Sequence, residues 1–270
     1  MEKPRKKIGL ALGSGAIRGL AHIGVIKSLI ANGIPIDYIA GSSIGGWIGA
    51  HYALYQDIQK LEEDTIGRKK EKLFSIWEPT WTGGFIKGNK FERLVSEWLH
   101  EASFADAKIP LQIVATDLVS GEPFVFKDGP LAIAIRSSVS VPSLFRPIRH
   151  EDKILVDGGV SDPVPDALVR AMGADIVISI NLDDCVKNEK FLDEKGHYGN
   201  AAERSLNIMR HHLAQRSMRD SDIVVEPYTP VIGFVSFRDY FNKDITSSLV
   251  ASGATEMEKY IPKLKELMLR

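Results

Sequence analysis

Residues 37–45 read Asp37-Tyr38-Ile39-Ala40-Gly41-Ser42-Ser43-Ile44-Gly45, a short apolar strand that runs directly into a serine flanked by glycines. The last five residues match G-x-S-x-G, and a helical pattern follows over residues 44–55. A strand, a sharp turn at a serine and a helix form the arrangement of a nucleophile elbow. Glycine at the flanking positions, Gly41 and Gly45, removes Cβ atoms that would collide as the chain reverses. The stretch predicts an α/β fold with Ser43 as nucleophile, although the pattern alone also fits a structural turn.

The rest of the chain alternates apolar runs of strand length with longer stretches of helical periodicity. This alternation indicates a mostly parallel sheet covered by helices. At 270 residues the chain is expected to form a single domain, residues 1–270. We expect strands at 8–12, 37–40, 111–116, 123–126, 153–156, 175–180 and 223–226, and helices at 19–32, 44–55, 131–138, 163–172, 201–219 and from 245 to the end.

The composition excludes several classes of protein. Thirty-four Lys and Arg face 35 Asp and Glu, a net charge of −1, so a broadly basic nucleic-acid surface is not expected. With 44% hydrophobic and 26% charged residues, the chain is typical of a globular protein and not of a disordered one. The single cysteine, Cys185, has no internal partner for a disulfide, which favours a reducing, cytoplasmic location.

The start of the chain is basic, from Met1 to Lys7, but the apolar run that follows at residues 8–12 is too short for the core of a signal peptide. No run approaches 18 consecutive apolar residues. Any membrane contact is therefore expected to be peripheral.

A second glycine-rich turn, Gly13-Ser14-Gly15-Ala16-Ile17-Arg18-Gly19, joins the first strand to the first helix. Its backbone N–H groups are suited to cradle a phosphate or to stabilise an oxyanion, and a purely structural βα turn is the alternative. A dinucleotide site fits poorly because the glycine spacing is one residue too long for that motif. In addition Asp37, where a ribose-binding acid would be sought, stands at the start of its strand and not at its end.

A third motif, Asp157-Gly158-Gly159, follows the strand predicted at 153–156. Asp157 is a candidate base toward a serine hydroxyl, and an Asp-Gly turn that caps the strand is the alternative. Among the histidines only His197 falls in the order Ser, Asp, His of an α/β-hydrolase, and its polar surroundings make it a weak candidate. No Cys/His spacing indicates a metal site, and no motif calls for a cofactor.

Taken together, these residues resemble the patatin-like phospholipase family, in particular its short bacterial members. The resemblance spans residues 8–172 and rests on four motifs in order: the loop with Arg18-Gly19, the elbow at Ser43, the run from Arg136 to Pro147 (RSSVSVPSLFRP), and Asp157-Gly158-Gly159. It implies a three-layer α/β/α sandwich. Many members have an unbroken glycine run before the Arg-Gly pair, which Ser14 and Ala16 interrupt here, while the backbone N–H donors remain.

The resemblance also implies a chemistry. It is that of a serine acyl hydrolase, an esterase, phospholipase A or lysophospholipase, that acts on a lipid or acyl ester through an acyl-enzyme. Ser43 and Asp157 would form a Ser-Asp dyad without histidine. The oxyanion and substrate-binding residues would be Gly13, Gly15, Ala16, Arg18 and Gly19. An acyltransferase and a weakly active lipid-binding protein are the alternatives.

Several features have open interpretations. Arg18 is expected either to bind a lipid phosphate or to pair with an acidic side chain, whereas Arg136 and Arg146 are expected to be structural. The aromatic stretches 73–86 and 231–237 are interpreted as a lid or as core, and the polar stretch 184–200 as an exposed loop. The oligomeric state is left open, and the last helix is expected to pack on the sheet or on a partner.

Overall fold

The computed structural model describes residues 4–66, 78, 80, 84–183, 201–229 and 242–270. Its centre is an eight-stranded sheet in the order β5-β6-β3-β2-β1-β7-β8, with β4 paired to β3 off this path. The five strands from β3 to β8 are parallel, whereas β4, β5 and β6 pair antiparallel. The expected mostly parallel sheet is thus confirmed, with a mixed edge. The strands are β1 (Ile8–Leu12), β2 (Tyr38–Ser42), β3 (Leu111–Asp117), β4 (Pro123–Phe126), β5 (Ile148–His150), β6 (Lys153–Asp157), β7 (Ile176–Ile180) and β8 (Ile223–Val225).

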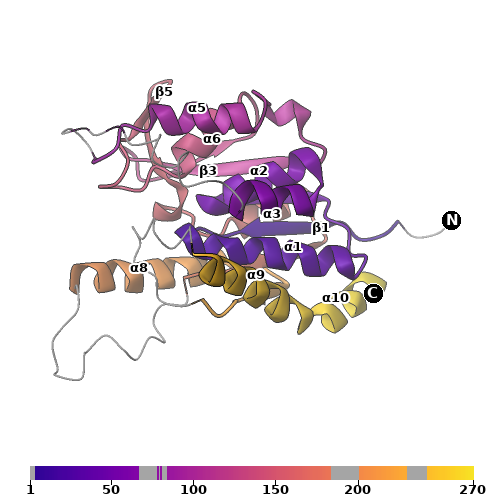
Figure 1. Ribbon diagram of the computed structural model, residues 1–270. Helices are drawn as coiled ribbons and strands as arrows, with labels where there is room; N and C mark the ends of the chain where they lie inside the picture. The colour runs from indigo at the N-terminus through magenta and orange to yellow at the C-terminus, as the bar shows by residue number, and fades with distance from the viewer. Residues whose placement is uncertain (1–3, 67–77, 79, 81–83, 184–200, 230–241) are drawn as a thin grey trace.

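Helices cover both faces of the sheet, so the three-layer α/β/α fold is confirmed (Figure 1). Helices α7 and α8 pack on one face, and α1, α2, α6 and α9 belong to the layer on the other. Figure 1 places α8 at the end of the molecule opposite to both termini. The helices are α1 (Ala21–Ala31), α2 (Ile44–Tyr55), α3 (Ile58–Ile66), α5 (Asn89–Trp98), α6 (Leu131–Ser138), α7 (Asp166–Ala171), α8 (Ala201–Ser217), α9 (Lys243–Glu258) and α10 (Ile261–Leu269).

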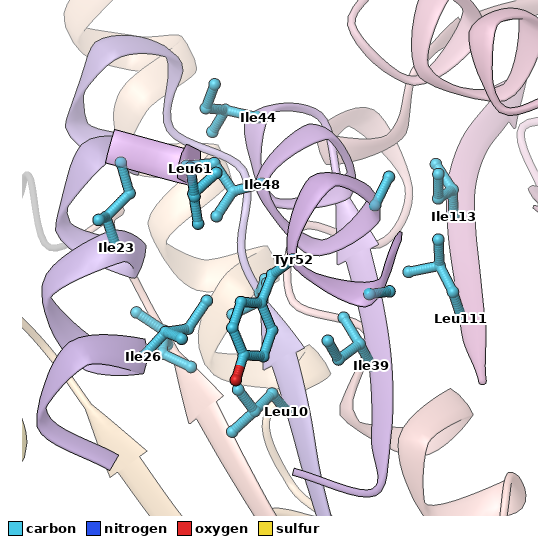
Figure 2. Close-up of a cluster of buried hydrophobic side chains, with 14 of the residues drawn as sticks. Leu10, Ile23, Ile26, Ile39, Ile44, Ile48, Tyr52, Leu61, Leu111 and Ile113 are labelled. Carbon is cyan, nitrogen blue, oxygen red and sulfur yellow. The ribbon is translucent and has the colours of Figure 1, made fainter. Parts of the chain in front are cut away.

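The two apolar layers follow from the alternation of side chains along each strand. In β1, Leu10 and Leu12 join the larger core cluster, while Ala11 joins a smaller cluster on the opposite face. Figure 2 shows the larger cluster, in which Ile48 and Tyr52 of α2 lie among side chains of strands and helices. Small residues on one face of β1 and large ones on the other therefore set how closely each helical layer approaches.

Three elements were not predicted from the sequence. Helix α3 begins after Asp57, whose carboxylate accepts the N–H groups of Gln59 and Lys60 at 3.0 and 2.9 Å. Helix α5 and the three-residue strand β5 were also missed. The helix predicted at 163–172 is shorter, because it begins only at Asp166 after Pro165. The predicted loop at 184–200, the stretch at 231–237 and most of 73–86 lie outside the described residues.

The C-terminal region packs on α1 and shares the larger core cluster with the strands. Helices α1 and α9 lie side by side (Figure 1), and their backbones meet at two glycines. A Cβ on Gly24 would lie 1.9 Å from the carbonyl oxygen of Val250, and one on Gly253 would lie 1.9 Å from that of Ala21. Pro262 in the first turn of α10 marks the break after α9. Within the described residues, no helix is long and apolar enough to cross a membrane.

The close contact between α1 and α9 can be tested by the direction in which a substitution of Gly24 changes the stability of the protein. Gly24→Ala would stabilise an isolated helix by about 1 kcal/mol through helix propensity. Here the new methyl group meets a backbone carbonyl, so we expect it to lower the free energy of unfolding by about 3 kcal/mol. Urea unfolding of the wild type and the variant measures the difference. An increase in stability would show that the two helices do not approach this closely.

Candidate functional site

Ser43 stands at the junction of β2 and α2 in a strained backbone conformation. Its φ is 55° and its ψ is −124°, a region that residues with a Cβ rarely occupy. Its N–H donates to the Oγ of Ser138 at 2.7 Å. Its own Oγ donates to the Oδ2 of Asp157 at 2.6 Å, and Ser43 is 6% exposed. The elbow predicted from the sequence is present in the structure.

The glycines of the elbow are required by close backbone approach. A Cβ on Gly41 would lie 2.5 Å from the carbonyl oxygen of Gly45. A Cβ on Gly45 would lie 2.0 Å from the carbonyl oxygen of Leu12 in β1. Neither position accepts a side chain without moving the backbone, so both glycines fix where α2 begins relative to the sheet.

Asp157 is the last residue of strand β6, and each of its polar atoms forms a hydrogen bond. Its Oδ1 accepts the N–H of Gly159 at 2.8 Å, while its Oδ2 accepts the hydroxyl of Ser43. Its own N–H donates to the carbonyl oxygen of Ser140 at 3.0 Å, and its carbonyl oxygen accepts the hydroxyl of Thr116 at 2.8 Å. These bonds orient the carboxylate toward the serine.

The glycine-rich turn leaves two donors unused. The N–H of Gly13 donates to the carbonyl oxygen of Ile180 at 3.1 Å, and that of Ser14 to Pro163 at 2.8 Å. Among the described residues, no group accepts the N–H of Gly15 or Ala16. Ala16 has a φ of 50°, a conformation that costs a residue with a Cβ. The turn therefore presents free backbone donors, as an oxyanion hole requires.

The turns of the site touch one another. A Cβ on Gly19 would lie 2.4 Å from side-chain carbons of Ile44, so the glycine-rich turn rests on the start of α2. A Cβ on Gly159 would lie 2.6 Å from the Oγ of Ser14. A Cβ on Gly158 would lie 2.3 Å from a carbonyl oxygen of β3. The structure thus brings the three predicted motifs together.

The carboxylate of Asp157 is buried, with 7% of the residue exposed. Burial raises its pKa above the ordinary value. The hydrogen bond from Ser43, the positive charge of Arg210 and the N–H of Gly159 oppose that rise, and the negative charge of Asp183 adds to it. A carboxylate with a raised pKa is a stronger base than an exposed one.

The sequence profile described as "Patatin-like phospholipase" matches residues 10–168. The chain belongs to the patatin-like phospholipase family. It is 34% identical over 181 residues to an uncharacterised NTE family protein of Mycobacterium bovis, covering 66% of this chain and 49% of the relative. It is 30% identical over 192 residues to a protein of Pyricularia oryzae named lysophospholipase NTE1, covering 67% of this chain and 12% of the relative. The patatin-like chain thus matches only part of each relative.

Among solved structures, VipD from Legionella pneumophila has the same fold. The TM-score is 0.69 at 12% identity, and the match covers 96% of this chain and 67% of that protein. At this identity the similarity supports the patatin fold and not a shared activity.

The structure shows which groups of the chain Arg18 contacts. Its guanidinium donates to the carbonyl oxygen of Leu182 at 2.6 Å and pairs with the carboxylate of Asp183 at 3.1 Å. Arg18 therefore pairs with an acidic side chain, as one of the two interpretations predicted. Arg136 is fully buried and donates to the carbonyl oxygens of Lys87, Gly88 and Arg146, which is a structural role. His197 and Cys185 lie outside the described residues.

Sequence reasoning missed two side chains beside the site, Asp183 and Arg210. Asp183 is 2% exposed and pairs with Arg18 through one oxygen and with Arg210 through the other, the latter at 3.0 Å. The same Nη2 of Arg210 donates to the Oγ of Ser14 at 3.0 Å. Arg210 comes from α8, 196 positions from Ser14, so no local pattern could have revealed the contact.

His22, a buried residue of α1, supports the glycine-rich turn. Its Nε2 lies 2.8 Å from the carbonyl oxygen of Gly13, so Nε2 carries the hydrogen and donates. Burial lowers the pKa of His22 to about 4, which keeps the ring neutral near pH 7. The hydrogen bond from His22 therefore fixes the carbonyl group of Gly13, the first residue of the turn.

Arg210 gives a prediction about pH. Arg210→Gln removes a positive charge that lowers the pKa of Asp157, while the negative charge of Asp183 remains. The pKa of Asp157 should then rise further, and the acidic limb of the pH profile for ester hydrolysis should move to higher pH. The measurement is kcat/KM against pH, with Arg216→Gln as the matched control, since Arg216 is an exposed residue of the same helix. Identical acidic limbs in the two variants would contradict the assignment.

His22 gives a second prediction for the turn. His22→Leu removes the donor to the Gly13 carbonyl, and we expect kcat to fall about tenfold with little change in KM. His22→Gln retains an N–H group on a side chain of similar reach and should restore most of kcat. Steady-state kinetics on a short ester tests both. Equal losses in the two variants would show that volume at this position matters and the hydrogen bond does not.

Proposed function

We propose that this chain is a serine acyl hydrolase of the phospholipase A or lysophospholipase type, in which Ser43 and Asp157 form a catalytic dyad. The observation that carries the proposal is the 2.6 Å hydrogen bond between Ser43 Oγ and Asp157 Oδ2, at a strained elbow beside the N–H groups of Gly15 and Ala16, for which the described residues offer no acceptor. A nucleophile in hydrogen-bond contact with an oriented base is the arrangement that covalent catalysis requires.

The mechanism has two halves. Asp157 takes the proton of Ser43 as Oγ attacks the carbonyl carbon of the ester, and the N–H groups of Gly15 and Ala16 donate to the oxyanion that forms. The C–O bond of the ester breaks, and Asp157 returns the proton to the departing alcohol. Water then attacks the acyl-enzyme, Asp157 takes a proton from it, and the acid leaves as Ser43 regains its hydrogen.

The environment of the dyad matters for its rate. An aspartate with a pKa near 4 is a weak base, and the raised pKa of Asp157 brings it closer to the pH at which it must act. Backbone donors to the oxyanion are each worth about 10²–10³ in rate, so the turn at Gly15 and Ala16 supplies much of the acceleration.

The substrate is proposed to be an ester of a lipid. Support comes from the family and from the fungal relative named a lysophospholipase, although the chain covers only 12% of that relative. Peripheral contact with a membrane follows from such a substrate. A cytoplasmic location, expected from the single cysteine, stays a prediction.

The dyad is tested with three variants. Ser43→Ala and Asp157→Asn should each lower hydrolysis of a short p-nitrophenyl ester by about 10³ or more, because they act as a unit. Ser42→Ala is the matched control: Ser42 adjoins the nucleophile, is fully buried, and its Oγ has no hydrogen-bond partner among the described residues. We expect it to retain turnover within about a factor of three. Loss of activity in Ser42→Ala but not in Ser43→Ala would overturn the assignment.

A fluorophosphonate probe separates the chemistry from its alternatives. Intact mass should show one adduct on the wild type and none on Ser43→Ala. Failure of the folded wild type to react would favour a lipid-binding protein without turnover. Product analysis with an added alcohol acceptor distinguishes hydrolysis from acyl transfer, since only a transferase would convert the acceptor into the main product.

A further inference from the structure

Exposed apolar side chains are concentrated at one end of the sheet. Ten large hydrophobic residues of the described chain are exposed, and seven of them lie in segments at the carboxyl ends of the parallel strands. Ser43 and the glycine-rich turn lie at the same end, because they follow β2 and β1. Exposed apolar groups gathered in one region indicate a contact surface, whereas scattered ones need no explanation.

On one side of the site, these residues belong to the β3 and β6 segments. Leu118 and Val119 directly follow β3 and are 54% and 76% exposed. Val160 lies three residues after Asp157, and the adjacent Ser161 is bonded to Thr116 of β3 at 2.8 Å. Since β3 pairs with β2 and β6 ends at Asp157, which is bonded to Ser43, this group flanks the site on that side.

On the other side, they belong to α8 and to the segment after β8. Arg210 of α8 contacts Ser14 of the glycine-rich turn, and α8 then runs back toward the start of β8. The residues before Arg210 therefore project beyond the carboxyl end of the sheet, where Figure 1 shows α8 extending past the strands. This projecting part carries Leu206, Ile208 and Met209, all exposed, and Tyr228 after β8 is 83% exposed. We name these four residues with Leu118, Val119 and Val160 the apolar rim.

The charge of α8 indicates what the rim contacts. Its sequence has three arginines against a single glutamate, Glu203, and its exposed, described side chains include His212 and Arg216. Exposed large apolar residues combined with basic ones on a helix are typical of segments that lie in the headgroup region of a bilayer. The apolar groups enter the boundary with the acyl chains, and the basic groups remain among phosphates.

We propose that the apolar rim docks this protein on a phospholipid surface with the Ser43 site facing the lipid. The proposal rests on the proposed function, because it assigns to that site the surface from which its substrate comes. The rim lies on both sides of the site, so a flat lipid surface can contact both groups at once. A second protein copy seated across both groups would instead cover the site.

The test measures binding and not turnover, so it remains readable if the proposed chemistry fails. All proteins carry Ser43→Ala and are mixed with phosphatidylcholine vesicles containing phosphatidylglycerol, and the bound fraction is measured by flotation. Two rim pairs are compared, Leu206→Ser with Met209→Ser, and Leu118→Ser with Val119→Ser. The matched control is Ile30→Ser with Leu269→Ser. It also removes two exposed apolar side chains, one from the last turn of α1 and one from α10, the helix at the end of the molecule opposite to α8 (Figure 1).

We expect each rim pair to weaken vesicle binding at least about tenfold and the control pair to change it less than about twofold. Thermal unfolding midpoints identify any pair that fails to fold, and the second rim pair then decides. Absence of binding by the parent, or equal binding by rim and control pairs, would overturn the proposal. So would light scattering that shows a dimer which the rim substitutions dissociate, since the rim would then be an interface between copies.

Discussion

The positive φ of Ser43 is the constraint on which the site depends. Such a backbone costs about 1–3 kcal/mol and persists only where its surroundings hold it. Here α2 is fixed against β1 by the contact of Gly45 with the Leu12 carbonyl, and the N–H of Ser43 is bonded to Ser138. With Ser43 in an extended or helical conformation, α2 would leave β2 in another direction and the hydroxyl would no longer face Asp157.

The antiparallel edge of the sheet explains how Asp157 reaches the serine. In the register of the sheet, Ser42 pairs with Val114 of β3, and Asp157 pairs with the next residue, Ala115. Because β4 occupies the other edge of β3 over these residues, Ser43 and Asp157 meet end to end along one edge of β3. Strand β6 arrives there from the opposite direction, so its last residue ends beside the elbow. A parallel strand in the same place would have its first residue beside the elbow and its last residue away from it.

Much of this arrangement was predictable because it is encoded in short stretches of sequence. The elbow, the glycine-rich turn and Asp157-Gly158-Gly159 each join a strand to a turn within a few residues, and their glycines mark the positions where two backbone segments lie too close for a side chain. Helix α5 was missed although Phe91, Leu94 and Val95 are spaced for one buried face. Asp183 and Arg210 could not be found in this way, because their pairing depends on where α8 packs after an intervening stretch of 17 residues, 184–200. Strand β5 has only three residues and exists through its pairing with β6.

The charges around the dyad explain how a buried carboxylate is retained there. One carboxylate oxygen of Asp183 pairs with Arg18 and the other pairs with Arg210. The positive charge of Arg210 offsets part of the cost of burying Asp157, while the Oδ2 of Asp157 remains bonded to Ser43. Because Arg210 also bonds Ser14, one residue of α8 links the electrostatics of the base to the position of the glycine-rich turn. The placement of α8 therefore affects both halves of the site from its inner face, while its outer face carries the exposed apolar side chains.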